Sequence, residues 1–286
     1  MNNHIEETVM TELMTKENNL SIEELSAQLG AASTSSGPSI PALGMNYDGE
    51  NGPMGAFFLK MGKDGNCQDN VYATENVKFR ALSSHIQWQH WQEKELINKT
   101  ILVNNMRDEA RDQLGGIRCG LPEYEDYWKL SEDARKKYEG IDKYRVVRGL
   151  VSYTGKTPDG REVTIENHPC VFSGKRKNYG SFYNDIVSKM PKGINLWDFE
   201  NILSKETKTN AYKKKFYVTR FSPQFGTPIP LDQLTYDSLS YVSNLISTEN
   251  KRIEDMHKNA VSEKDDAEEA DRIMDAVDTL SEDMRV

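Results

Sequence analysis

The stretch Tyr144-Arg-Val-Val-Arg-Gly-Leu-Val-Ser-Tyr153 decides the fold. β-Branched and aromatic residues dominate it, and such residues favour an extended strand. The turn sequence Pro158-Asp-Gly160 comes next, and Val163–Ile165 then provides a second extended run. A turn of this kind between two extended runs predicts a β-hairpin over residues 144–165.

The same alternation of turns and short apolar runs continues on both sides of this hairpin. Asn46–Gly49, Asn51–Pro53 and Lys63–Asn66 are turn clusters on the N-terminal side, and Lys213–Phe221 is a basic, aromatic run on the C-terminal side. About eight short strands with few helices between them predict a mainly β chain that folds as a small antiparallel barrel. Apolar residues at helical spacing predict a closing helix over residues 232–259.

The formal net charge of -9 is concentrated at the two ends of the chain. Residues 1–36 hold six acidic residues and one Lys, and residues 262–286 hold ten acidic and three basic residues. The remaining residues, 37–261, therefore hold 32 basic and 29 acidic residues, a net charge of +3. A mildly basic body between two acidic ends favours a polyanionic partner.

These charges divide the chain into three parts. Residues 1–38 are expected to be an acidic, flexible arm, residues 39–261 the folded domain with its closing helix, and residues 262–286 a detachable acidic tail. Such a tail can compete with a polyanion for a basic surface, fold onto a partner protein, or remain a solvated terminus without a role. Four apolar residues recur along the tail at helical spacing and form the predicted partner-binding face: Ile273, Val277, Leu280 and Met284.

The sequence lacks the usual signals of several classes of protein. There is no apolar run of about 18 residues and no apolar segment behind a basic N-terminus, so we expect neither a membrane span nor a secretory leader. Cys67, Cys119 and Cys170 are odd in number and far apart, which predicts reduced thiols in the cytoplasm and no zinc site. The sequence has no nucleotide-binding or hydrolase motif, and its five His are scattered. We therefore predict a protein that is not an enzyme and holds no cofactor or metal.

The positive signal is the repeated mixing of basic and aromatic residues along predicted strands. Cationic side chains follow the phosphates of a single-stranded nucleic acid, while aromatic rings stack on its bases. Four such clusters recur, around residues 78–91, 144–153, 172–182 and 212–221. The residues predicted to form a groove for single-stranded DNA are Arg80, Trp88, Arg145, Arg148, Lys175, Arg176, Lys177, Tyr179, Lys213, Lys214, Lys215 and Tyr217.

Each cluster also has a purely structural interpretation. Aromatic residues on strands usually belong to a core, and Lys213–Lys215 alone is typical of an edge strand protected against aggregation. Trp88 and Trp91 are three residues apart, so they cannot both face one side of a flat strand. Gly174 and Gly180, which flank the 175–177 run, are expected to let the backbone approach a nucleic acid closely. The prediction of a groove for single-stranded DNA therefore depends on the recurrence of all four clusters and not on any one of them.

Several segments share their order and character with a known family. They are Pro41–Asp48 followed by Gly55–Phe57, Val71–Ala73 followed by Val77–Arg80, Asp112–Gly120, Val147–Val151, Phe172 ahead of the basic 175–177 run, and a closing helix with Asn250. In these segments, over Ile40–Lys258, the chain resembles the acidic-tailed single-stranded DNA-binding proteins of bacteriophages, of the podophage type.

This resemblance implies an OB-fold, a role in phage DNA replication and recombination, and a location in the cytoplasm of the infected host cell. It also implies that the tail recruits the phage DNA polymerase or helicase–primase. The tail departs from the family pattern, because it ends in Met284-Arg-Val286 where family members end in an aromatic residue.

We therefore predict a non-sequence-specific single-stranded DNA-binding protein whose acidic tail competes with DNA. Two rivals stay open. One is a phage protein-interaction module, such as a transcription or host-takeover factor, in which the same clusters form an interface. The other is an enzyme whose site the sequence does not reveal. The sequence leaves a homodimer, the length of the binding site and the preference between DNA and RNA undecided.

Overall fold

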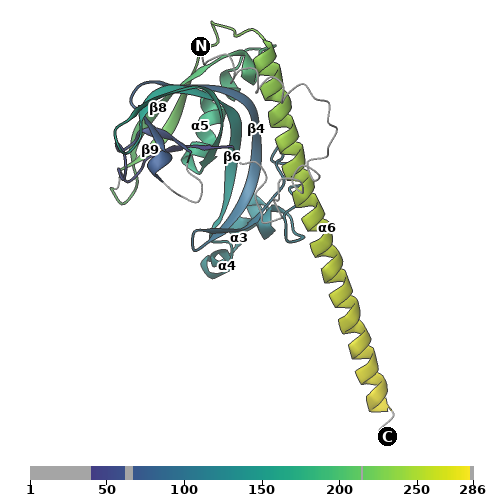
Figure 1. Cartoon of the computed structure of the whole chain (residues 1–286). Helices are drawn as coiled ribbons and strands as arrows, with labels where there is room; N and C mark the ends of the chain where they lie inside the picture. The colour runs from purple at the N-terminus through teal and green to yellow at the C-terminus, as the bar shows by residue number, and fades with distance from the viewer. Residues whose placement is uncertain (1–39, 62–66, 214, 284–286) are drawn as a thin grey trace. The chain divides into compact units, whose positions relative to one another are not determined.

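The structure is a computed structural model that describes residues 40–61, 67–213 and 215–283, with side chains as far as residue 267 (Figure 1). Strands dominate this part of the chain. They are β1 (Ala42–Met45), β2 (Phe57–Lys60), β3 (Val71–Ala73), β4 (Val77–Gln92), β5 (Glu95–Lys99), β6 (Ile141–Lys156), β7 (Glu162–Lys175), β8 (Asn201–Thr209) and β9 (Lys215–Pro223). The α-helices are α3 (Tyr124–Lys129), α4 (Glu132–Lys136), α5 (Lys177–Asp185) and α6 (Gln233–Asp283).

Five of the strands close into a barrel. β1 pairs with β2, β2 with β3, β3 with β6, and β6 with β7, all antiparallel, and β7 returns to β1 in a parallel pairing at Ala42 and Val171. The predicted barrel is therefore confirmed as a closed, mixed barrel, consistent with an OB-like fold. An all-antiparallel ring was the wrong detail, because a closed ring with an odd number of strands cannot reverse direction at every step.

The predicted hairpin forms the centre of the sheet. Tyr153 pairs with Ile165, and the two strands extend well beyond the predicted residues to form β6 and β7. β4 pairs along β6 outside the barrel and carries both β5 and the β8–β9 hairpin. Gly149 lies where β6 passes β4, and a Cβ there would come within 2.8 Å of the Phe79 ring, so only glycine fits without a shift.

The barrel core lies between the strands and α5. Leu59, Val147, Val151 and Phe172 are buried in it, and Phe182 of α5 packs against the same cluster. The burial of the nineteen side chains of this cluster, most of them large and apolar, provides most of the driving force for folding. α5 is thereby held in a fixed place at the end of β7.

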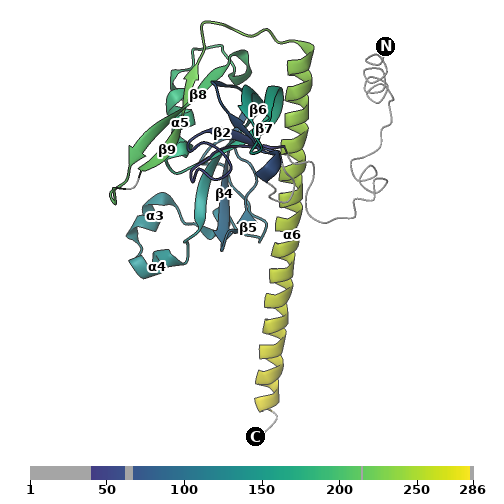
Figure 2. The same ribbon diagram turned by 60° about the vertical axis from the view of Figure 1, so that its left-hand side comes forward.

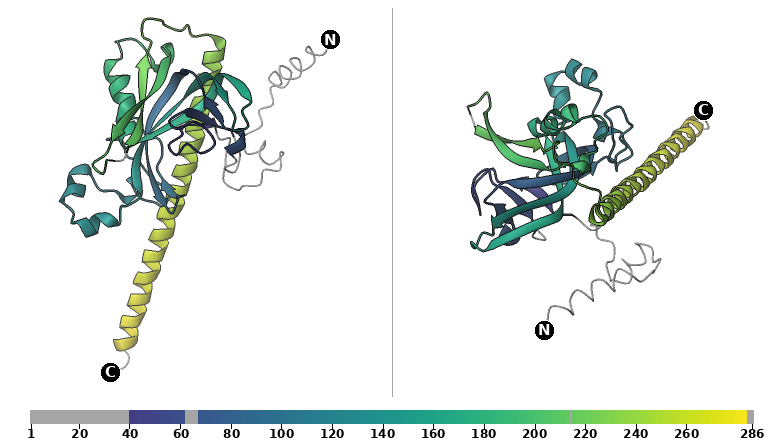
Figure 3. Two further views of the ribbon diagram at one scale, coloured as in Figure 1. Left: turned by 90° about the vertical axis from the view of Figure 1, so that its left-hand side faces the viewer. Right: turned by 90° about the horizontal axis from the view of Figure 1, so that it is seen from above.

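α6 covers the opposite face of the β4–β6 pair (Figures 1 and 3). Val242 and Ile246 pack on apolar side chains of the sheet, and the Asn250 side chain accepts a hydrogen bond from the amide of Leu102 at 2.7 Å and donates one to its carbonyl at 3.0 Å. Although α6 has 51 residues, neither it nor any other described helix is apolar enough over a sufficient length to cross a bilayer.

The closing helix does not end at residue 259 as predicted. α6 continues to Asp283, through most of the expected tail, because residues 260–283 contain no Gly or Pro to stop it. Ile273, Val277 and Leu280 lie on this helical backbone, but their side chains and all of Met284 lie outside the described residues, as does the arm at residues 1–38.

Candidate nucleic-acid interface

The two faces of β6 have different surroundings. Tyr144 and Val146 cluster with Ile246 of α6, and Leu150 clusters with Val242 of the same helix. The alternate residue Arg145 points the other way, toward Tyr179 of α5. Because successive side chains of a strand point to opposite faces, Arg145 and Arg148, three positions apart, lie on different sides of the sheet.

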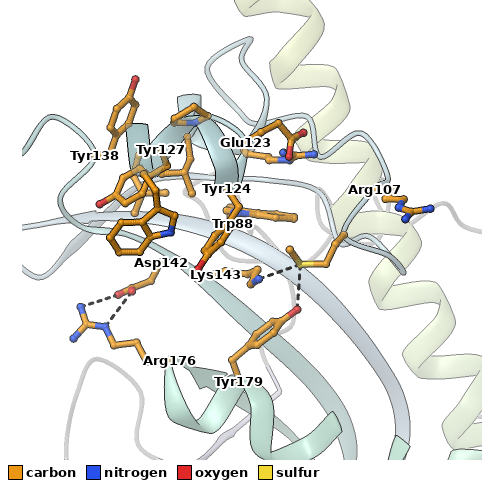
Figure 4. Close-up of a pocket in the computed structure, with 16 residues that line it drawn as sticks. Trp88, Arg107, Glu123, Tyr124, Tyr127, Tyr138, Asp142, Lys143, Arg176 and Tyr179 are labelled. Carbon is orange, nitrogen blue, oxygen red and sulfur yellow. Dashed lines mark hydrogen bonds and ion pairs between the residues drawn. The ribbon is translucent and has the colours of Figure 1, made fainter. Parts of the chain in front are cut away.

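The face that α6 leaves free opens into a pocket of about 840 Å³. Its floor comes from β4 and the start of β6, one wall from α3 and the segment after α4, and the other wall from the β7–α5 junction. Figure 4 shows aromatic side chains on one side, Tyr179 and Arg176 on the other, and Asp142 and Lys143 between them. Six aromatic residues line the pocket: Trp88, Tyr124, Tyr127, Trp128, Tyr138 and Tyr179.

The α3 wall is an aromatic cluster that was not among the site residues predicted from the sequence. Tyr124 and Trp128 are 73% and 55% exposed, and their rings meet edge to face at 6.0 Å. Tyr127 packs against Trp128 at 5.4 Å, and the Arg135 guanidinium lies 5.4 Å from the Trp128 ring. The rings are therefore ordered by one another yet accessible to a flat ligand. The signal in the sequence that could have indicated this cluster is the presence of three aromatic residues within five residues of a polar helix.

The opposite wall gathers cations around Tyr179. The Lys143 ammonium lies 4.4 Å and the Arg145 guanidinium 5.0 Å from the centre of this ring. Burial lowers the pKa of Lys143, and the neighbouring charges of Arg145 and Arg118 lower it further. The contacts of Lys143 and Arg145 with the Tyr179 ring are cation–π interactions, and together they fix Tyr179 at the edge of the pocket.

Two carboxylates neutralise part of this positive charge. Asp142 contacts the Lys175 ammonium at 3.0 Å and the Arg176 guanidinium at 3.2 Å. Glu123 contacts the Arg118 guanidinium at 2.5 Å, and Arg118 in turn lies 5.6 Å from the centre of the Trp88 ring. The pocket lining thus holds four cationic side chains and two acidic ones, a net excess of two positive charges: Arg107, Arg118, Lys143 and Arg176 against Glu123 and Asp142.

Three of the predicted site residues line this pocket, and others lie close to it. Arg176 and Tyr179 contribute to the wall, and Trp88 to the floor. Trp88 is only 3% exposed, so it offers little area for stacking. Arg145 and Lys175 lie beside the pocket through Tyr179 and Asp142, and Lys177 is the exposed first residue of α5.

Two predicted residues lie elsewhere and correct the sequence interpretation. Arg80 is buried and donates to the Trp197 carbonyl at 2.7 Å and to the Thr235 hydroxyl at 2.8 Å, near the start of α6. Arg148 is buried and paired with Glu249 of α6. Both anchor the helix and do not form part of an exposed groove. Which sheet face a helix covers is a long-range property that residue type does not reveal.

Of the remaining predicted residues, the described ones lie on the β8–β9 hairpin. Lys213 and Lys215 are exposed there, Tyr217 is half-buried, and Lys214 lies outside the described residues. The expected role of Gly174 also changes, because a Cβ at this position would come within 2.8 Å of the Asn178 carbonyl oxygen. This glycine lets α5 begin close against β7, and the backbone there does not face an open surface.

The polar groups of the pocket do not form a recognisable catalytic set. Asp142 and Glu123 are engaged in ion pairs, and burial raises the pKa of the nearby Cys119 thiol to about 12, which disfavours the nucleophilic thiolate. Within the described residues, no three His, Cys, Asp or Glu side chains gather as metal ligands would. The arrangement is suited to stacking flat groups and binding anions.

Comparison with known proteins found no match for this chain among protein-family models, curated proteins or solved structures.

Proposed function

We propose that the chain binds single-stranded DNA, without sequence preference, at the pocket between α3 and α5. One observation carries the proposal: six aromatic and four cationic side chains line one concave surface. Each base of an unpaired strand has two faces that can stack on such rings, and the phosphates between them attract the cations. The bases of a duplex are already stacked on one another, so they cannot use the rings in this way.

The biological setting of this proposal comes from the resemblance to phage proteins. We propose a role in phage DNA replication and recombination within the cytoplasm of the infected host cell. The acidic residues 262–286 would compete with DNA for the basic surface and contact a replication protein, such as the polymerase or helicase–primase. Removing residues 268–286 should then raise DNA affinity severalfold at low salt and less at high salt, since salt screens the repulsion. An unchanged affinity would dismiss the competition.

A protein-interaction module is the alternative that one observation favours. Tyr124 and Trp128 are exposed beside Arg135, and Tyr, Trp and Arg are the residues most enriched at binding hot spots between proteins. A phage transcription or host-takeover factor would use the same rings on a partner protein. Titration with oligonucleotides separates the two, because a protein-binding surface of this kind needs no affinity for unstructured DNA.

The proposal is tested by removing the exposed rings one at a time. Trp128→Ala and Tyr124→Ala should each weaken binding of a fluorescent oligothymidylate about tenfold, since one stacked base contributes about 1–3 kcal/mol. Their unfolding free energy should change little, because both side chains are exposed.

Tyr236→Ala is the matched control. This tyrosine is 59% exposed on α6, outside the pocket, and its removal should leave oligonucleotide affinity unchanged. Equal affinities for all three variants and the wild-type protein would contradict the proposal.

A further inference from the structure

A second group of aromatic and basic side chains lies outside the pocket. The rings of Tyr47, in the loop after β1, and Tyr217 of β9 are 6.5 Å apart and 30° from parallel. The Lys205 ammonium lies 5.4 Å from the centre of the Tyr217 ring and donates to the Met54 carbonyl at 3.1 Å. Tyr47 is 52% exposed, so a ring face is available at this place as well.

The first turn of α5 connects this second group to the pocket. The Asn178 amide donates to the Tyr47 hydroxyl at 3.2 Å and accepts from the backbone amide of Thr219 at 2.8 Å. The next residue, Tyr179, lines the pocket. Neighbouring residues of a helix point about 100° apart, so one turn of α5 faces both groups. A strand of DNA that leaves the pocket past Arg176 therefore reaches Tyr47 by crossing a single turn of α5.

The β8–β9 hairpin extends the second group further. Tyr212 near its tip is 85% exposed, and Lys213 and Lys215 beside it are exposed cations. The hairpin and the α3–α4 segment lie on the same side of the barrel in the views of Figures 2 and 3 (left). Aromatic rings interleaved with lysines in this way match the alternation of bases and phosphates along a single strand.

We infer that single-stranded DNA bound in the pocket continues across the first turn of α5 onto Tyr47 and Tyr217 and then along the β8–β9 hairpin. This inference rests on the proposed function. It specifies the path of the bound DNA strand and the length of DNA that is needed to contact both groups. The pocket alone engages a short oligonucleotide. The second group adds affinity only when the strand is long enough to cross α5.

The test compares two lengths of oligothymidylate, about 6 and about 16 nucleotides, which lie within the range of site sizes for one OB fold. Tyr47→Ala should weaken binding of the long oligonucleotide about tenfold and leave the short one unchanged. Because Tyr47 also accepts a hydrogen bond from Asn178, the double variant Tyr212→Ala with Lys215→Ala provides a second test at the exposed hairpin. It should show the same dependence on length.

The outcomes separate this inference from the proposed function. If the short oligonucleotide binds in a Trp128-dependent way but neither variant affects the long one, the path across α5 is wrong and the pocket stands. Equal losses at both lengths would also overturn the path, since they would place Tyr47 within the first site. If the wild-type protein binds neither length, the proposed function itself fails.

Discussion

Arg145 and Arg148 of β6 are three residues apart and carry the same charge, but they lie on opposite faces of the sheet. Arg148 is buried under α6 and paired with Glu249, which also contacts the Lys99 ammonium at 2.7 Å. Arg145 lies on the other face, with its guanidinium against the Tyr179 ring at the edge of an open pocket. The comparison shows that strand alternation and helix packing, more than residue type, decide whether a cation is buried against a helix or faces an open pocket.

The α6 face has the physical character of a structural contact. Burial alone would raise the pKa of the Glu249 carboxyl, but Lys99 and Arg148 hold this pKa below its usual range, so the carboxylate stays charged. Among the described residues, Arg80 Nη2, Arg148 Nη1 and His85 Nδ1 are buried without a hydrogen-bond partner. Charges placed so far from water depend on their partners across the helix–sheet contact.

The largest expected effect comes from exchanging the two arginines for alanine. Arg148→Ala leaves Glu249 with one cation fewer in a buried setting, so we expect the unfolding free energy to fall by about 3 kcal/mol. Arg145→Ala should lower it by less than about 1 kcal/mol while weakening oligonucleotide binding several-fold. Urea denaturation and anisotropy titration measure the two quantities. A greater loss of stability in Arg145→Ala than in Arg148→Ala would reverse the assignment of the faces.

A smaller effect concerns pH and the partly buried His85. Burial, with Arg148 and Arg145 nearby, lowers the pKa of this ring to about 4. The unfolded chain binds the proton near pH 6.5 and the folded protein does not, so the unfolding free energy should fall as pH drops from 6.5 toward 4. Between pH 7 and pH 5 we expect a loss of about 1–2 kcal/mol, because part of the ring is exposed and solvent screens the arginines.

The control for this pH effect is His85→Gln, which removes the titrating group. Its unfolding free energy should change less between pH 7 and pH 5 than that of the wild-type protein. Keeping the measurement at pH 5 or above separates His85 from Glu249, whose lowered pKa makes its contribution to stability disappear only at more acidic pH. The same slope in both proteins would show that His85 does not carry the effect.

The smallest expected effect lies on the pocket side. Asp142→Asn removes the carboxylate that contacts Lys175 and Arg176, so these cations become available to phosphate. We expect oligonucleotide affinity to rise about two- to fivefold at low salt, since exposed ion pairs contribute less than about 1 kcal/mol. The matched control is Asp133→Asn, because Asp133 pairs with Lys136 on α4 outside the pocket lining. A loss of affinity in Asp142→Asn would show that Asp142 supports the site.

The strands could be predicted from sequence because their signal is local. Tyr144–Tyr153 and Val163–Ile165 pair as expected, since β-branched residues and an intervening turn favour the hairpin without help from distant residues. The end of α6 could not be located, because no Gly or Pro marks it. A stop signal would have been needed near residue 259.

The candidate site was only partly predictable for a different reason. Arg176 and Tyr179 were predicted as site residues because charge and aromatic character coincide in one short segment, and both line the pocket. Tyr124 and Trp128 were not among the predicted site residues, since only the fold brings α3 opposite α5. Arg148 was wrongly assigned to the groove. Alternation along the strand separates it from Arg145, but only tertiary packing shows that α6 covers the face that carries Arg148.

The most direct measurement is a titration of the wild-type protein with single-stranded and double-stranded oligonucleotides of the same length at two salt concentrations. If the open face of the sheet stacks unpaired bases and attracts phosphates, single-stranded DNA should bind much more tightly than duplex. Its affinity should also fall with salt, with a log–log slope of about -0.7 for each phosphate contacted. Equal affinity for duplex, or an affinity that does not change with salt, would contradict the assignment of this face to single-stranded DNA.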